Sequence, residues 1–184
     1  QIWARPTVQS YQGGVSMDVV VVRELVSAIF SGHDGRAIDI IHESELSQEA
    51  CVVDQEIGVS AFHFAILKRR EVVSLEMLHK VGVAHLRPGA EGHTALHLAA
   101  LSNLPKVVVS LIEMLPQEDL GAQDFSGRSA LMLAAKSGHS DVAMTLIDAM
   151  AADQLELIDT KDGMSALGFA CQMPEVDFSS VVER

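Results

Sequence analysis

One stretch of nine residues recurs along the chain and constrains its fold more than any other feature. The clearest copy, Gly92 to Ala100, reads GHTALHLAA. Weaker copies begin at Gly58, Gly127 and Gly163, so the successive glycines lie 34, 35 and 36 residues apart. Self-similarity with this period indicates a solenoid, in which each unit packs against its neighbours rather than around one central core.

The sequence within one unit predicts two helices joined by a tight turn. In the second copy, Thr94 stands where a hydroxyl can cap a helix over about 95–102. Asn103 follows at a turn that needs a left-handed residue, and Pro105 is suited to begin the second helix. That helix then carries one apolar face at three- and four-residue spacing, formed by Val107, Val108, Leu111, Ile112 and Leu115.

The other units repeat this plan with differences. In the third unit, Ser129 is the expected cap and Gly138 the expected turn residue. The first unit has Arg69 and Arg70 where the third has Gly-His. The fourth unit runs from Asp162 until Pro174 interrupts it. These differences predict units of the same architecture but unequal regularity.

With these residues the chain resembles the ankyrin-repeat family from about residue 17 to its end, most closely over 91–150. Six residues of the second unit match the family motif, and Ala95 replaces its proline; the matches are Gly92, Thr94, Leu96, His97, Ala99 and Ala100. The resemblance implies an all-α ankyrin-repeat solenoid with short β-hairpin-like loops. It also implies a structural role for His97 and His63, as buried rings that tie neighbouring turns together.

Four repeats and an N-terminal helix pair are expected. Residues 1–16 form a tail or extension, and 17–54 form an atypical capping pair with helices at 17–30 and 36–43. The repeats follow at about 55–88, 89–123, 124–159 and 160–184, the last of them incomplete. Because the chain begins without Met and ends soon after a repeat begins, we interpret it as a piece of a longer protein.

Composition excludes several classes of function. The net charge of −12 disfavours binding to nucleic acid or to anionic membranes. No apolar run is long enough to insert directly into a membrane. The two cysteines, Cys51 and Cys171, lie at opposite ends of the expected stack, which favours a reduced, intracellular and cytoplasmic setting over a disulfide scaffold.

No motif in the chain predicts catalysis, a cofactor or a metal. His93 and His97 lie four residues apart, a spacing that metals use, but no third ligand stands near them. Nucleophile elbows and phosphate-binding loops are also missing from the sequence. The basic cluster from Lys68 to Arg70 allows two interpretations, a solvated helix end or an anchor for an acidic partner segment.

The predicted function is non-enzymatic binding of a partner protein or peptide on the concave face, with the chain acting as a monomer. Phe125 and Leu101 are the best anchor candidates, because they are large apolar groups at positions expected to face water. The partner is expected to carry an apolar anchor with acidic flanks. The alternative is a regulatory or targeting segment of a larger enzyme, channel or bacterial effector. The expected partner-binding residues are Val59, Leu67, Lys68, Glu91, His93, Leu101, Ser102, Phe125, Arg128, Lys136, Ser137, Met164 and Gln172.

Overall fold

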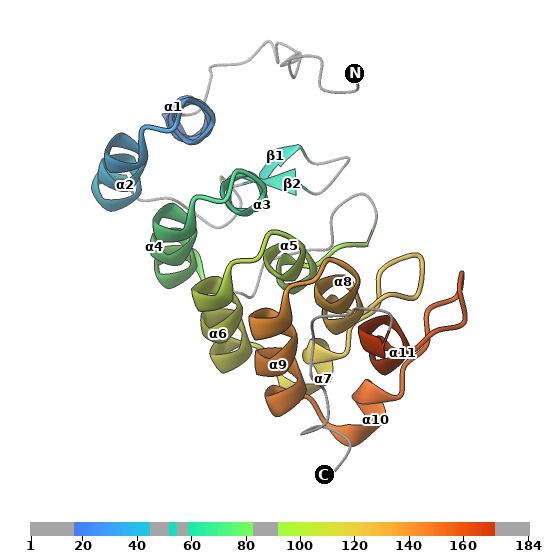
Figure 1. Cartoon of the computed structure of the whole chain (residues 1–184). Helices are drawn as coiled ribbons and strands as arrows, with labels where there is room; N and C mark the ends of the chain where they lie inside the picture. Colours follow the sequence, from blue (N-terminus) through green and yellow to red (C-terminus); the bar gives the residue numbers. More distant parts are fainter. Residues whose placement is uncertain (1–16, 45–51, 55–58, 83–91, 172–184) are drawn as a thin grey trace.

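The fold consists of two parallel rows of short helices (Figure 1). A computed structural model describes residues 17–44, 52–54, 59–82 and 92–171. The inner row contains α1 (Met17–Ser31), α3 (Ala61–Leu67), α5 (Ala95–Leu101), α8 (Ala130–Lys136) and α11 (Ala166–Cys171). The outer row contains α2 (Asp34–Glu43), α4 (Glu71–Val81), α6 (Pro105–Met114) and α9 (Ser140–Ala149). Single-turn helices α7 (Gln117–Leu120) and α10 (Ala152–Leu155) follow α6 and α9.

The positions of the inner helices confirm the predicted period. Helices α3, α5, α8 and α11 begin at Ala61, Ala95, Ala130 and Ala166, the same place in each copy of the motif. Ser60, Thr94 and Ser129 cap the first three of these helices, each accepting a hydrogen bond from the backbone N–H three residues later. The expected all-α solenoid is therefore the observed architecture.

The turn between the two helices is the same in four successive units. The backbone N–H groups of His33, Arg70, Leu104 and His139 donate to the carbonyls of Ala28, Ala65, Ala99 and Ala134 over 2.9–3.1 Å. The residue before each of these donors has positive φ: Gly32 (76°), Arg69 (55°), Asn103 (54°) and Gly138 (78°). The N-terminal helix pair therefore has the construction of a repeat although its sequence lacks the motif.

Two of these turn residues carry a side chain in the left-handed region. Asn103 adopts it as the sequence predicts, since asparagine tolerates this conformation better than most residues. Arg69 has no such tolerance, and an L-residue there costs roughly 1–2 kcal/mol. The first recognisable repeat thus carries local strain that the third repeat, with Gly138, avoids.

One continuous hydrophobic core runs between the two rows of helices. Ala65, Ala99 and Ala134 are completely buried, and their small side chains let neighbouring inner helices approach closely. Leu25 and Ile29 of α1 are also completely buried and belong to this core. The N-terminal pair is therefore packed as part of the stack.

Short antiparallel contacts form in the loops that connect the units. β1 (Val52–Asp54) pairs with β2 (Val59–Ser60) just before α3. The expected boundary between residues 54 and 55 falls inside this hairpin, so residues 52–54 belong with the repeat that follows them. Later loops contain the single bridges Gln123–Ser129 and Ile158–Ser165. The tail expected at 1–16 lies outside the described residues.

Candidate protein-binding surface

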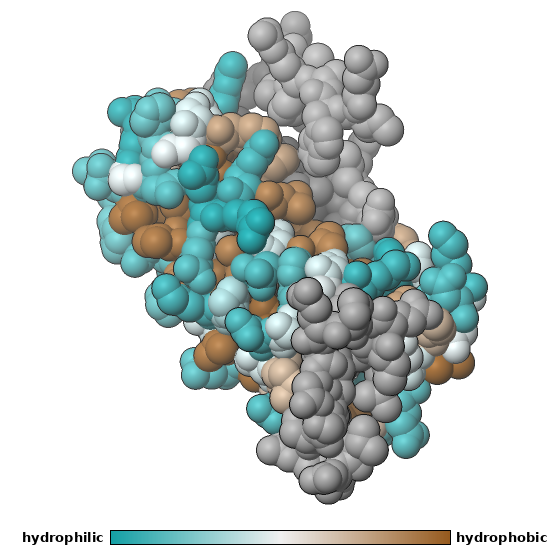
Figure 2. All heavy atoms as spheres, in the orientation of Figure 1, coloured by the Kyte–Doolittle hydropathy of each residue, from teal (hydrophilic) through white to brown (hydrophobic). Residues whose placement is uncertain are grey.

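Four equivalent side chains lie at the C-terminal ends of the inner helices, each two residues before the positive-φ residue of its turn. They are Phe30, Leu67, Leu101 and Lys136, and we call this set the inner edge. Phe30 is 47% exposed, and Leu67 and Leu101 are each 40% exposed. Apolar surface is visible over α3 and also over the outer helices at the left of the view, between hydrophilic side chains (Figure 2). The inner edge therefore presents three apolar groups in succession, followed by a cation.

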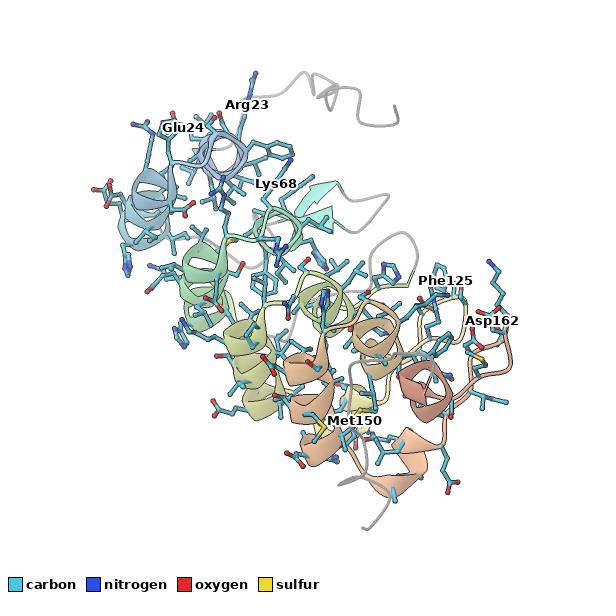
Figure 3. The ribbon with its side chains drawn as sticks, in the orientation of Figure 1. Arg23, Glu24, Lys68, Phe125, Met150 and Asp162 are labelled. Carbon is cyan, nitrogen blue, oxygen red and sulfur yellow. The ribbon has the colours of Figure 1, made fainter. Side chains whose placement is uncertain are left out.

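Lys68 connects the first two units across this edge. Its Nζ lies 4.4 Å from the centroid of the Phe30 ring, and that ring packs against Phe64 at 5.3 Å between centroids. Figure 3 labels Lys68 on α3, on the side towards α1. A cation over an aromatic face is attracted to the ring and still presents its charge to solvent. Lys68 therefore places a positive charge beside the exposed Phe30.

Lys136 ends the inner edge in a comparable environment. Its Nζ lies 5.2 Å from the centroid of the Phe169 ring and 3.6 Å from Oδ2 of Asp162. The Lys136 and Asp162 side chains are 48% and 42% exposed, and ion pairs between exposed groups contribute little to stability. The Lys136 ammonium therefore remains accessible to a second carboxylate.

Negative charge is segregated from the inner helices. Helices α3, α5, α8 and α11 contain no Asp or Glu. The outer helices contain eight, three in α2, two in α4, one in α6 and two in α9. Two acids that directly follow the turns are paired across repeats, Asp34 with Arg70 at 3.5 Å and Glu71 with Lys106 at 3.4 Å. Four of the five inner helices are thus free of acids in a chain of net charge −12, whereas α1 contains Asp18 and Glu24.

Phe125 is the most exposed large apolar side chain among the described residues, at 80%. Its ring lies over the α-carbon of Gly92, so a Cβ added at Gly92 would stand 2.8 Å from the ring. Figure 3 shows Phe125 at the loop that precedes α8. The close approach to Gly92 fixes one side of the ring and leaves most of the ring in solvent, the exposure that the sequence predicts.

A buried carboxylate holds the same loop together. The Asp124 side chain is fully buried. Its Oδ2 accepts a hydrogen bond from Nε of Arg128 and forms an ion pair with Nη2, both at 2.8 Å, and its Oδ1 accepts from the backbone N–H groups of Ser126 and Arg128. Burial alone would raise the pKa of Asp124, but the hydrogen bonds from Arg128 and Ser126 outweigh burial and lower it. His93 Nε2 lies 3.1 Å from the same Oδ2.

Arg128 and His93 therefore differ from their expected surface roles. Their side chains are only 25% and 14% exposed, because both are directed at Asp124. The sequence placed them beside the turn glycines but could not show that the loop folds around a carboxylate. Both side chains support the shape of the loop through Asp124.

His97 is buried and bonded as predicted. Its Nδ1 accepts from the Thr94 backbone N–H at 3.2 Å and lies 2.8 Å from the Thr94 hydroxyl. These contacts leave the proton on Nε2, which donates to the carbonyl of Arg128 in the next unit at 2.8 Å. Burial lowers the pKa of His97, so the ring stays neutral and bridges two repeats.

The two histidines of the second repeat both contact residues of the next repeat. The rings of His93 and His97 stack at 5.8 Å between centroids, while their Nε2 atoms contact Asp124 and the Arg128 carbonyl respectively. Within residues 17–44, 52–54, 59–82 and 92–171, no group of three or more His, Cys, Asp or Glu could hold a metal ion.

The remaining expected contact residues are unequally placed. Ser137 is exposed and Ser102 partly buried, each at the end of an inner helix. Met164, an expected contact residue, is partly buried and packs against the core, and its backbone N–H donates to Oδ1 of Asp159 at 3.0 Å. Val59 lies in β2, whereas Glu91 and Gln172 lie outside the described residues.

Phe30 was missed at the sequence level. The N-terminal pair has no copy of the recurring motif, so no alignment of repeats reached it. A usable signal was present in the turn, where Ser31-Gly32-His33 matches Ser137-Gly138-His139 of the third repeat. When the repeats are aligned on their inter-helix turns instead of their first helices, Phe30 stands at the position equivalent to Leu67 and Leu101.

These features define a solenoid of stacked helix-turn-helix units with a loop at one end of each unit. Comparison with protein families agrees: the model for ankyrin repeats (3 copies) matches residues 109–182, and the single ankyrin-repeat model matches 91–124. The chain belongs to the ankyrin-repeat family. No curated protein matched it. Ankyrin repeats generally mediate protein–protein interaction, and they are typically non-catalytic.

No helix in the described part of the chain is long and apolar enough to cross a membrane. The longest, α1, has 15 residues, whereas a span needs about 20.

Proposed function

We propose that this chain is a non-catalytic protein-binding module that takes a partner protein or peptide on its inner, loop-bearing side. The partner carries an apolar anchor flanked by acidic residues. Phe125 and Leu101 contact the apolar part, while Lys68 and Lys136 attract the acids.

The observation that carries the proposal is the charge segregation. Eight acids lie on the outer helices and none on α3, α5, α8 and α11, although the whole chain is strongly acidic. An acidic ligand would be repelled by the acids of the outer row, whereas along the inner edge it would meet apolar side chains and the cations Lys68 and Lys136. Charge complementarity of this kind directs a partner to one face and excludes others.

Affinity capture followed by a binding assay tests the proposal. The wild-type chain is used to isolate a partner, and the same partner is measured against Phe125→Ala and Lys136→Glu. Phe125→Ala should weaken binding by about 2 kcal/mol, because a positioned, solvent-exposed aromatic ring is typical of an interface anchor. Lys136→Glu should mainly slow association and reduce its salt dependence.

Val109→Ala is the matched control, since Val109 is 42% exposed but lies on the outer helix α6. It should bind like the wild type. A partner that tolerates Phe125→Ala and Lys136→Glu but is lost with Val109→Ala would contradict the proposal. Arg128 is a poor test residue, because its guanidinium supports Asp124 and the shape of the loop.

An intracellular setting and a monomeric state belong to the same proposal. The setting rests on the two widely separated cysteines, and sedimentation of the purified chain measures the oligomeric state. A stable dimer that covers the inner edge would count against partner binding there.

A further inference from the structure

We infer that the inner edge binds an extended acidic peptide segment with an apolar residue at every third position, and that the N-terminal helix pair supplies the first contact of this site through Phe30. The inference rests on the proposed function and deepens it. It adds a repeat that lies outside the family matches, and it states the spacing of the ligand.

The first step is the equivalence of four positions. Phe30, Leu67, Leu101 and Lys136 each stand two residues before the positive-φ residue of a turn with the same hydrogen bonds. Residues directly before them point into the core, since Ile29, Ile66 and Ala100 are completely buried. The exposed apolar side chains at these helix ends therefore form a narrow row that buried residues border on one side.

The second step is the spacing of that row. Packed helices lie about 8–10 Å apart, so each repeat advances the row by about that distance. A polyproline II segment has three residues per turn and rises about 9 Å per turn, which keeps every third side chain on one face. A β-strand returns to the same face after two residues, about 7 Å, and would fall out of register. An amphipathic helix presents an apolar stripe too wide for a single row.

The third step is the charge along the row. Lys68 lies over the exposed ring of Phe30, and Lys136 occupies the fourth position of the row. Glu24 of α1 is directed away from the row, because it pairs with Arg36 of α2 at 3.6 Å. The ligand that fits this row therefore has three apolar residues, one at every third position. One acidic residue lies beside the first apolar residue, and another follows the third apolar residue.

The test measures a fluorescein-labelled synthetic peptide against the whole chain by fluorescence anisotropy. The peptide has leucine at every third position with glutamate and serine between, and a scrambled peptide of the same composition has its leucines at alternate positions. The wild-type chain should bind the first peptide more tightly than the second, by about tenfold or more in Kd. A version with lysine in place of glutamate should not bind.

Variants of the chain assign the contacts. Phe30→Ala, Leu67→Ala and Leu101→Ala should each weaken the Kd by about tenfold. Val72→Ala and Val109→Ala are matched controls, because both valines are exposed on outer helices, and they should stay within about twofold of wild type. Thermal melts establish that each variant is folded. Lys68→Glu, an exposed change at the C-cap of α3, provides a second test if Phe30→Ala weakens the fold.

The outcomes separate this inference from the proposed function. Equal binding of both peptides, no binding by the wild type, or full affinity in both Phe30→Ala and Lys68→Glu would overturn the inference. A captured partner that depends on Phe125 but not on Phe30 would also overturn it, while leaving the proposed function intact. Loss of binding with Phe30→Ala but not with Val72→Ala is the result expected.

Discussion

At the scale of single residues, two histidines in equivalent positions differ in one hydrogen bond. His63 and His97 each accept the backbone N–H of the residue that caps their helix, at 3.1 and 3.2 Å. His97 Nε2 also donates to the Arg128 carbonyl of the next unit, whereas His63 Nε2 is buried and has no hydrogen-bond partner among the described residues. Comparing the two histidines therefore measures how much the hydrogen bond between repeats contributes to the stability of the fold.

His97→Ala should destabilise the chain by roughly 1–3 kcal/mol, since it leaves buried backbone groups unpaired and removes the bridge between repeats. His63→Ala should cost about 1 kcal/mol less, because only the bonds within its own helix turn are lost. Urea denaturation midpoints of the two variants provide the measurement. Equal midpoints would mean that the bond between repeats contributes nothing.

The sequence predicted burial of both rings but not this difference. The motif fixes the capping arrangement, because Ser60 or Thr94 and the histidine three residues later belong to one turn. The acceptor for Nε2 comes from the next repeat, so its position depends on the length and shape of the intervening loop. A sequence pattern carries no information about that geometry when the loops differ in composition.

At the scale of elements, adjacent loops are joined by their backbones. Thr160 donates from its backbone N–H and from its hydroxyl to the Ser126 carbonyl, at 3.0 and 2.7 Å. This approach requires a glycine at 127, because a Cβ there would lie 2.8 Å from the Thr160 backbone nitrogen. Gly138 also has positive φ, 78°, but no atom lies within 4 Å of where its Cβ would be.

Gly127→Ala should therefore destabilise the chain more than Gly138→Ala. Both substitutions place a side chain at positive φ, at a cost of roughly 1–2 kcal/mol. Gly127→Ala must also move backbone in the neighbouring loop, and such overpacking adds about 1–3 kcal/mol. Thermal unfolding of the pair provides the comparison, with Gly138→Ala as the control for φ. Similar losses in both would show that the loops are not packed this closely.

The elements themselves were largely predictable from the sequence. Small residues, capping hydroxyls and three- and four-residue spacing are local signals, so α3, α5, α8 and α11 begin where the motif predicts. The inner edge was only partly predictable. Leu67 and Leu101 follow from the motif, but Phe30 required the turn of a pair that has no motif, and the burial of Arg128 depends on Asp124.

At the scale of the whole molecule, the buried histidines tie stability to pH. Burial lowers the pKa of His63 to about 4 and also lowers the pKa of His97. The unfolded chain takes up these protons near pH 6.5, before the folded chain does. The stabilisation is therefore complete above about pH 6.5 and is lost as the pH falls towards 4.

His63→Gln should reduce the loss of stability that occurs as the pH falls from 6.5 to 4. Glutamine does not titrate, and it can still accept the Ser60 backbone N–H in a capping box. The wild type should lose up to roughly 3 kcal/mol more than the variant between pH 6.5 and 4. Asp124, whose pKa is lowered, contributes stability that is lost only below its usual range near 3.8. A pH profile of His63→Gln that runs parallel to that of the wild type would refute the assignment.

The central claim about the molecule is that partners bind the inner row and avoid the outer row. The chain offers exposed methyl groups on both, Leu67 and Leu101 on inner helices and Val72 and Val109 on outer helices. Methyl NMR of the labelled chain, titrated with the captured partner or with the acidic peptide, compares the two rows in one experiment. We predict that the Leu67 and Leu101 methyl signals shift while those of Val72 and Val109 stay in place. Shifts confined to Val72 and Val109 would place the partner on the outer row and contradict the account.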